Sequence, residues 1–114
     1  MTYFINEKMR EDSNNTFYAE FFKGKWNLED GWWNEGSVCI NAYTMEVIGL
    51  TELLYQFVPD YDPFAEVEVT EPQWNHISQK AAETGGELFE AIKEVTPWVK
   101  DNFQRHQVFT ILGL

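Results

Sequence analysis

Residues 65–70 read Ala-Glu-Val-Glu-Val-Thr, and this strict alternation constrains the fold more than any other stretch of the chain. Successive side chains of a strand point to opposite faces, so Ala65, Val67 and Val69 predict one buried face and one solvent-facing face. The next stretch, residues 70–73 (Thr-Glu-Pro-Gln), has the form of a capping box with proline in the first helical turn. We therefore expect a half-buried strand that leads directly into a helix.

The same reasoning divides the rest of the chain into short elements. Stretches rich in β-forming residues predict further strands at 2–6, 16–22, 37–42 and 107–112. Apolar residues at helical spacing predict helices at 45–58 and from residue 70, another after a second capping box at 84–87, and a short one at 98–103 after Thr96-Pro97. Residues 10–15 and 29–36 are predicted loops. This order predicts an α+β fold, with a mixed or antiparallel sheet of about four to five strands covered on one face by three to four helices.

Length and composition predict one domain, residues 1–114, with an apolar core that needs no metal or disulfide. The lone cysteine, Cys39, lies in an apolar run, so we expect a buried, unreactive thiol in a reducing compartment. The first fifteen residues show no signal-peptide pattern, and the longest apolar stretch is too short and too polar to span a bilayer. We therefore expect a cytoplasmic protein without a membrane partner.

Charge is distributed very unevenly along the chain. There are 19 acidic and 8 basic residues, which give a formal net charge of −11. The 54 residues between Lys25 and Lys80 contain no lysine or arginine and ten of the acids. We expect this segment to form an acidic patch that repels nucleic acids and anionic lipids and attracts basic proteins. The alternatives are that these acids scatter around the molecule, or that they serve solubility alone.

Two adjacent tryptophans, Trp32 and Trp33, lie in a loop inside this acidic segment. Neighbouring side chains of an extended chain point in opposite directions, so one core cannot easily bury both rings. We expect one ring to pack inward and the other to join an acidic-aromatic recognition surface, because tryptophan and tyrosine anchor interfaces and tryptophan also binds cations over its face. The predicted partner-binding residues are Glu29, Asp30, Trp32, Trp33, Glu35, Asp60, Tyr61, Asp62, Glu66 and Glu68. The alternative is that both tryptophans fill the core beneath the loop.

The sequence contains no motif that names a reaction. His76 and His106 lie thirty residues apart, and no HExxH, CxxC or glycine-rich phosphate loop is present. Asp60 and Asp62 lack the glycine and the distant glutamate of a calcium loop. We therefore predict a protein that is not an enzyme, with no catalytic residue, no metal site and no cofactor.

In its small size, acidity, aromatic content and lack of a catalytic motif, the chain resembles the immunity proteins of bacterial toxin–immunity systems, including those of contact-dependent inhibition and polymorphic toxins. The resemblance implies a basic cognate toxin domain, often a nuclease, that is bound 1:1 and neutralised. The acids would then stand in for the phosphates of the toxin's substrate, and attraction between opposite charges would speed association.

Three other functions remain open from the sequence. A small enzyme or ligand-binding domain would place Trp32 or Trp33 in a pocket with an acid such as Asp60 or Glu68 as base. A DNA mimic would space its acids regularly, as phosphates are spaced. A homodimeric structural protein would associate through the apolar C-terminal segment 109–114.

Overall fold

The computed structural model describes residues 2–113. In chain order its elements are β1 (Phe4–Asn6), α1 (Glu7–Ser13), β2 (Tyr18–Lys23), the 3-10 turn η1 (Leu28–Asp30), β3 (Val38–Asn41), α2 (Ala42–Val47), α3 (Leu50–Phe57), β4 (Glu66–Thr70), α4 (Glu71–Thr84), α5 (Gly86–Phe103) and β5 (Val108–Leu112). The five strands form one sheet in the order β1-β3-β2-β5-β4, and each neighbouring pair is antiparallel. The predicted α+β fold is confirmed, and the sheet is antiparallel rather than mixed.

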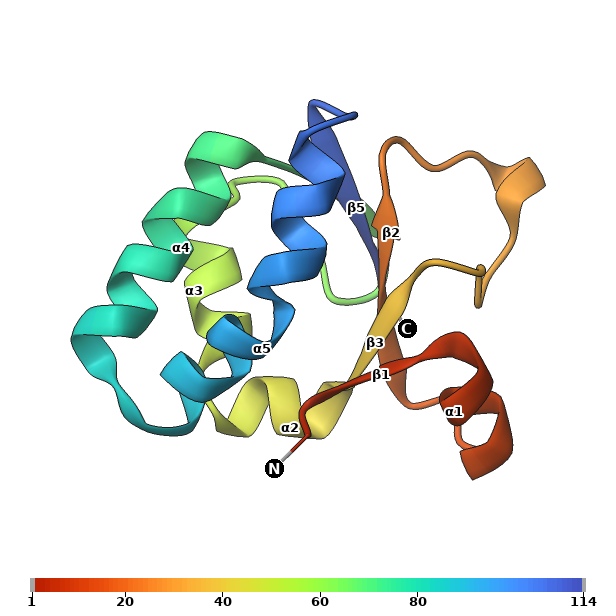
Figure 1. Ribbon diagram of the computed structural model, residues 1–114, viewed down its shortest axis with the longest axis horizontal. Coiled ribbons are helices and arrows are strands. Elements are labelled where there is room, and N and C mark those ends of the chain that lie inside the picture. Colours follow the sequence, from red (N-terminus) through yellow and green to blue (C-terminus); the bar gives the residue numbers. More distant parts are fainter. Residues whose placement is uncertain (1, 114) are drawn as a thin grey trace.

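The two faces of the sheet have different coverings. Helices α3, α4 and α5 lie on one side, while α1 and the long connection from β2 to β3 lie on the other (Figure 1). On β4, Val67 and Val69 enter the core under the helices, and Glu66 and Glu68 are exposed on the opposite face, as the alternation predicted. Within residues 2–113, every helix is too short or too polar to cross a membrane.

Aromatic rings fill the space between the sheet and the helices. Phe21 of β2 is fully buried and contacts the rings of Phe4, Trp74, Trp98 and Phe109 at centroid distances of 5.3 to 6.2 Å. Edge-to-face and offset contacts of this kind add to the stabilisation that burial provides. These contacts join β1, β2 and β5 to helices α4 and α5, and the hydrophobic core contains side chains from all five strands.

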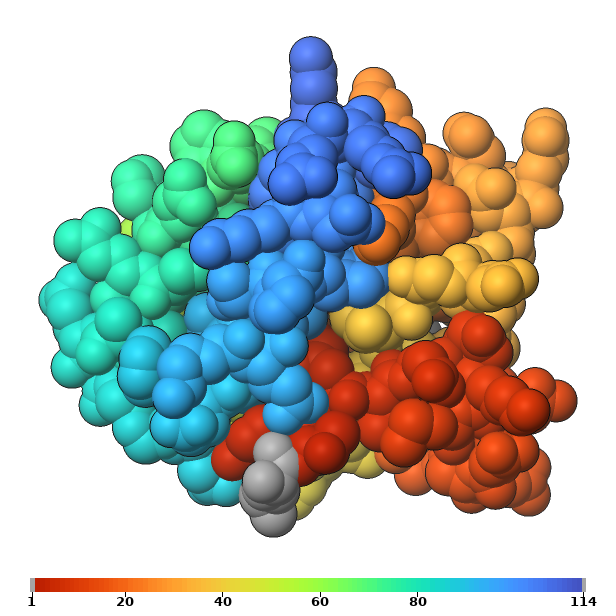
Figure 2. Space-filling model, in the orientation of Figure 1, coloured from red at the N-terminus to blue at the C-terminus, as the bar shows by residue number. Residues whose placement is uncertain are grey.

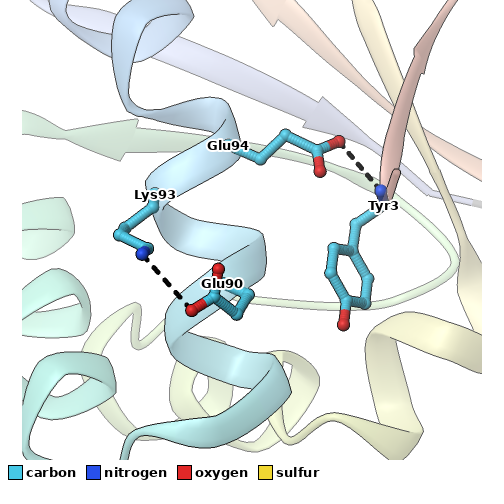
Figure 3. Close-up of a pocket in the computed structure, with 4 residues that line it drawn as sticks. All are labelled: Tyr3, Glu90, Lys93 and Glu94. Atoms are coloured by element: carbon cyan, nitrogen blue, oxygen red, sulfur yellow. Dashed lines mark hydrogen bonds and ion pairs between the residues drawn. The ribbon is translucent and has the colours of Figure 1, made fainter. Parts of the chain in front are cut away.

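The C-terminal strand β5 is internal, between β2 and β4, and all five of its residues are buried. Segment 109–112 is thus part of the sheet rather than a free apolar tail, and Leu114 lies outside the described residues. At the far edge, the Glu94 side chain of α5 accepts a hydrogen bond from the backbone N–H of Tyr3 at 2.8 Å (Figure 3). Glu94 also accepts one from the N–H of Phe4 at 2.6 Å, and together these bonds fix the start of β1. Figure 2 shows this N-terminal segment lying directly against α5.

The predictions for residues 10–15, 45–58 and 84–87 are wrong. Residues 7–13 form helix α1 instead of leading into a loop at 10–15, because Asn6 caps its first turn and Asn14 ends it in a left-handed conformation. The predicted helix 45–58 is two helices, α2 and α3, which meet at Gly49 with a φ of 97°. The second capping box at 84–87 does not form, because the Thr84 hydroxyl donates to the carbonyl of Lys80 within α4.

The proline at position 97 does not start a new helix, contrary to the prediction from Thr96-Pro97. It lies inside the continuous helix α5. Proline has no N–H to donate, but the buried residues Val95 and Val99 hold the helix against the core on both sides of it. The Thr96 hydroxyl also donates to the carbonyl of Ile92 at 2.7 Å. Tertiary packing therefore outweighs the local preference for a break.

Candidate functional site

The geometry of the tryptophan loop depends on one buried carboxylate, Glu20. This residue lies in the middle of β2 on the face opposite the helices and is 0% exposed. Its two oxygens accept hydrogen bonds from the backbone N–H groups of Trp33 (2.5 Å) and Asn34 (2.8 Å), and from the Asn34 side chain (3.1 Å). Hydrogen bonds to an ionised acceptor are stronger than those between neutral groups. Glu20 thus ties the β2–β3 connection to the sheet.

Trp33 connects the loop to Glu20 and to Arg10. Its φ of 64° is unusual for a residue with a side chain, and the hydrogen bond from its N–H to Glu20 favours this conformation. The guanidinium group of Arg10 lies 4.1 Å from the centroid of the Trp33 ring, as in a cation–π contact. Arg10 is itself 92% buried, so this contact joins helix α1 to the β2–β3 connection.

Trp32, by contrast, is 51% exposed. Its ring meets that of Trp26 edge to face, with centroids 5.0 Å apart, and the Trp26 indole N–H donates to the carbonyl of Gly31 at 2.7 Å. The structure therefore separates the two adjacent rings: Trp33 is partly buried under Arg10, and Trp32 is presented on the surface.

Beside these rings, the outer face of β4 and β5 forms an open groove of about 560 Å³, which we call the acidic groove. Glu66 and Glu68 lie on one face of β4, opposite Leu112 and Thr110 of β5, and Asp60 joins them from the segment that precedes β4. The acidic groove is lined by Trp26, Asp60, Glu66, Val67, Glu68, Thr70, Gln73, Val108 and Thr110. It contains three carboxylates and, within residues 2–113, no lysine or arginine.

These three carboxylates have no cationic partner in the described part of the chain. The ion pairs there join Lys23 with Asp101 and Lys93 with Glu90, both away from the acidic groove. Negative charges that share a concave surface make the local electrostatic potential more negative and attract cations. The acidic groove is therefore suited to receive basic groups from another molecule.

Comparison with known proteins does not indicate a function, so the function is inferred from the surface of this protein. No protein-family model, curated protein or solved structure matches this chain.

A second hollow, the aromatic pocket, adjoins the acidic groove. It encloses about 290 Å³ and is lined by Phe17, Ala19, Ala42, Met45, Glu46, Thr51, Tyr55, Tyr61, Pro63, Phe64 and Gly113. A small depression lined by Trp32, Phe64, Glu66 and Gly113, among others, lies between the two and shares residues with each. Phe17, Tyr55 and Phe64 are large exposed apolar side chains at this pocket. The carboxylates and the aromatic rings thus form one continuous surface, which we call the acidic-aromatic surface.

The other predicted site residues have different surroundings. Glu29 and Glu35 are exposed on the β2–β3 connection and do not line the acidic groove. The carboxylate of Asp30 accepts the backbone N–H of Asn27, and that of Asp62 accepts the N–H of Phe64, so both shape turns. Tyr61 is 91% buried and lines the aromatic pocket.

Neither the cysteine nor the histidines form an evident reactive centre. Cys39 is fully buried, and burial, with a smaller effect from Glu20, raises the pKa of its thiol to about 12. His76 lies against Phe57 and His106 against Gly24. Within residues 2–113, no group of three or more His, Cys, Asp and Glu side chains is arranged to hold a metal ion.

Sequence analysis did not identify Glu20, Arg10 or Trp26 as residues that organise the site. For Glu20 a signal exists, since it is a single acid within the otherwise apolar and aromatic stretch of residues 17–22. A buried charge needs specific partners, so such a residue predicts a fixed polar contact. The distant partners of Arg10 and Trp26 leave no comparable pattern in the sequence.

Proposed function

We propose that this protein is a non-catalytic binding protein, of the immunity type, that neutralises a basic toxin domain in a 1:1 complex. The observation that carries the proposal is the acidic groove, where Asp60, Glu66 and Glu68 converge without a cationic partner beside exposed aromatic rings.

The chemistry of this surface supports a protein partner. Aromatic side chains supply large apolar contact area with few rotatable bonds, and they are frequent among the residues that dominate binding energy. Trp32 and Phe64 are 51% and 73% exposed, which leaves much of their area free for a partner to bury. Lysine and arginine side chains of a basic protein would meet the carboxylates of the acidic groove and the face of Trp26.

The net charge of −11 supports the same proposal from a distance. Opposite net charges increase the rate of encounter between proteins, and this effect weakens as salt screens the charges. A nuclease toxin carries a basic site for phosphates, so carboxylates in the acidic groove would occupy the position of its substrate.

The test uses tagged protein as bait in extract from its own cells, with mass spectrometry of the eluate. The bait is the natural sequence, a groove variant (Asp60→Asn, Glu66→Gln and Glu68→Gln), or a control variant with the same charge change at exposed acids elsewhere (Glu11→Gln, Asp12→Asn and Glu83→Gln). We expect a basic protein in stoichiometric amount with the natural and control baits and its loss with the groove variant. Equal recovery by all three baits would reject the acidic groove as the binding site.

A growth assay tests neutralisation. Expression of the captured basic protein alone should stop growth, and co-expression with the natural protein should restore it. If the captured protein is harmless to cells, the protein binds a partner but is not an immunity protein.

A further inference from the structure

The aromatic pocket differs in chemistry from the acidic groove beside it. Four aromatic rings contribute to its walls, those of Phe17, Tyr55, Tyr61 and Phe64. Its one charged lining residue within residues 2–113 is Glu46, which is exposed at the surface of α2. A hollow of about 290 Å³ is large enough for a small group rather than for a large ligand.

The rings of Tyr55 and Tyr61 contact each other edge to face in this pocket. Their rings are nearly perpendicular, at 83°, with centroids 5.0 Å apart. Tyr61 is 91% buried and lines the aromatic pocket together with Tyr55. Burial, with smaller effects from Tyr55 and Asp62, raises the pKa of Tyr61 to about 12, so its hydroxyl remains neutral at physiological pH.

We propose that the aromatic pocket binds a substituted ammonium group, with the aromatic rings around the cation and Glu46 as its counter-ion. The negative faces of aromatic rings attract cations, and pockets of several rings with a carboxylate are suited to ammonium groups that carry carbon substituents. A neutral apolar group would gain from the rings but not from Glu46. An anion would be repelled by Glu46 and by the neighbouring carboxylates.

The ammonium group has two sources, a free small amine or a lysine side chain of a bound protein. The pocket chemistry is the same for both. The inference does not rest on the proposed function, since a free amine would bind whether or not a basic protein also occupies the acidic groove.

Amide proton–nitrogen NMR spectra of the whole protein test the inference directly. The probes are choline and its neutral isostere 3,3-dimethylbutan-1-ol, which has the same shape without the charge. We expect choline to shift the amide signals of residues 42–51 and of residues 61, 62, 64 and 65, and to bind at least fivefold more tightly than the alcohol. Equal binding of the two, or shifts that lie elsewhere, would overturn the proposal.

Two variants localise the charge effect. Glu46→Gln should weaken choline binding at least fivefold, whereas Glu52→Gln, which removes an exposed acid that does not line the pocket, should leave it unchanged. Both positions are exposed, so each variant should fold, and its NMR spectrum without ligand confirms this. Unchanged choline binding in Glu46→Gln would contradict the assigned counter-ion.

A third probe, N-acetyl-lysine methylamide, distinguishes the two sources of the ammonium group. It carries a lysine side chain on a capped backbone. Tighter binding of this probe than of choline would indicate a protein side chain as the natural occupant, and the reverse order would indicate a free amine. If no probe binds, this inference is overturned, but the proposed role of the acidic groove is not affected. If the groove variant still binds its partner, only the proposed function is contradicted.

Discussion

The perturbation that best tests the organisation of the tryptophan loop is Glu20→Gln. Glutamine has the shape of glutamate, but one of its acceptor oxygens is replaced by an NH₂ group. Since the two Glu20 oxygens bind the N–H groups of Trp33 and Asn34 separately, one of these donors would face another donor. Glu20 is fully buried, so water cannot replace the lost acceptor.

The expected loss in the free energy of unfolding is about 2 to 3 kcal/mol, from one hydrogen bond to a charged acceptor and one buried N–H left unsatisfied. This is a large part of the total stability of a small domain, roughly 5 to 15 kcal/mol. Urea unfolding followed by circular dichroism measures it, and the midpoint should fall by roughly 0.7 to 3 M for an m-value of about 1 to 3 kcal/mol per M.

A control variant separates the buried contact from a general charge effect. Glu68→Gln removes the same charge from an exposed site on the same face of the sheet and should change stability by less than about 0.5 kcal/mol. If Glu20→Gln were as stable as Glu68→Gln, the claim that Glu20 holds the loop would be refuted.

Three further predictions concern the burial or the contacts of individual residues. Burial raises the pKa values of Cys39 and Tyr61 to about 12 each, so the native state keeps protons that the unfolded chain releases near pH 9 and pH 10, respectively. Stability should therefore fall above about pH 9 because of Cys39 and more steeply above about pH 10 because of Tyr61, by at most about 1.4 kcal/mol per pH unit for each group. Denaturant melts that do not change between pH 8 and 11 would contradict this. Glu94→Ala should speed hydrogen exchange of the Tyr3 amide at least tenfold, and unchanged exchange would show that β1 does not depend on this carboxylate. Gly113→Ala should shift the backbone at residues 63–65, since a Cβ would lie 2.2 Å from the carbonyl oxygen of Pro63. Unaltered amide NMR signals of Phe64 and Ala65 would be inconsistent with this close approach.

Local patterns in the sequence predict much of this fold. The alternation in 65–70 correctly predicts which side chains of β4 are buried, and the capping box at Thr70 forms with hydrogen bonds in both directions between Thr70 and Gln73. These features are predictable because each depends on residues a few positions apart.

Some of the missed features depend on distant contacts. Helix α1 is short, and one of its contacts is made by Arg10 lying over Trp33, twenty-three positions away in the chain. Pro97 stays within α5 because the core packs against the helix on both sides of it. The acidic groove could not be predicted from the sequence, because only the order of the strands in the sheet brings Asp60 and Trp26 next to β4.

The most direct test of the proposed function is the dissociation constant of the captured basic partner with the natural protein and with the groove variant (Asp60→Asn, Glu66→Gln and Glu68→Gln). Both are measured by surface plasmon resonance at low and near-molar salt. We expect the groove variant to bind at least a hundredfold more weakly, and salt to slow association of the natural protein tenfold or more, because the groove carboxylates carry the electrostatic attraction. Equal affinity of the two proteins, with an association rate that salt does not change, would show that the partner binds elsewhere.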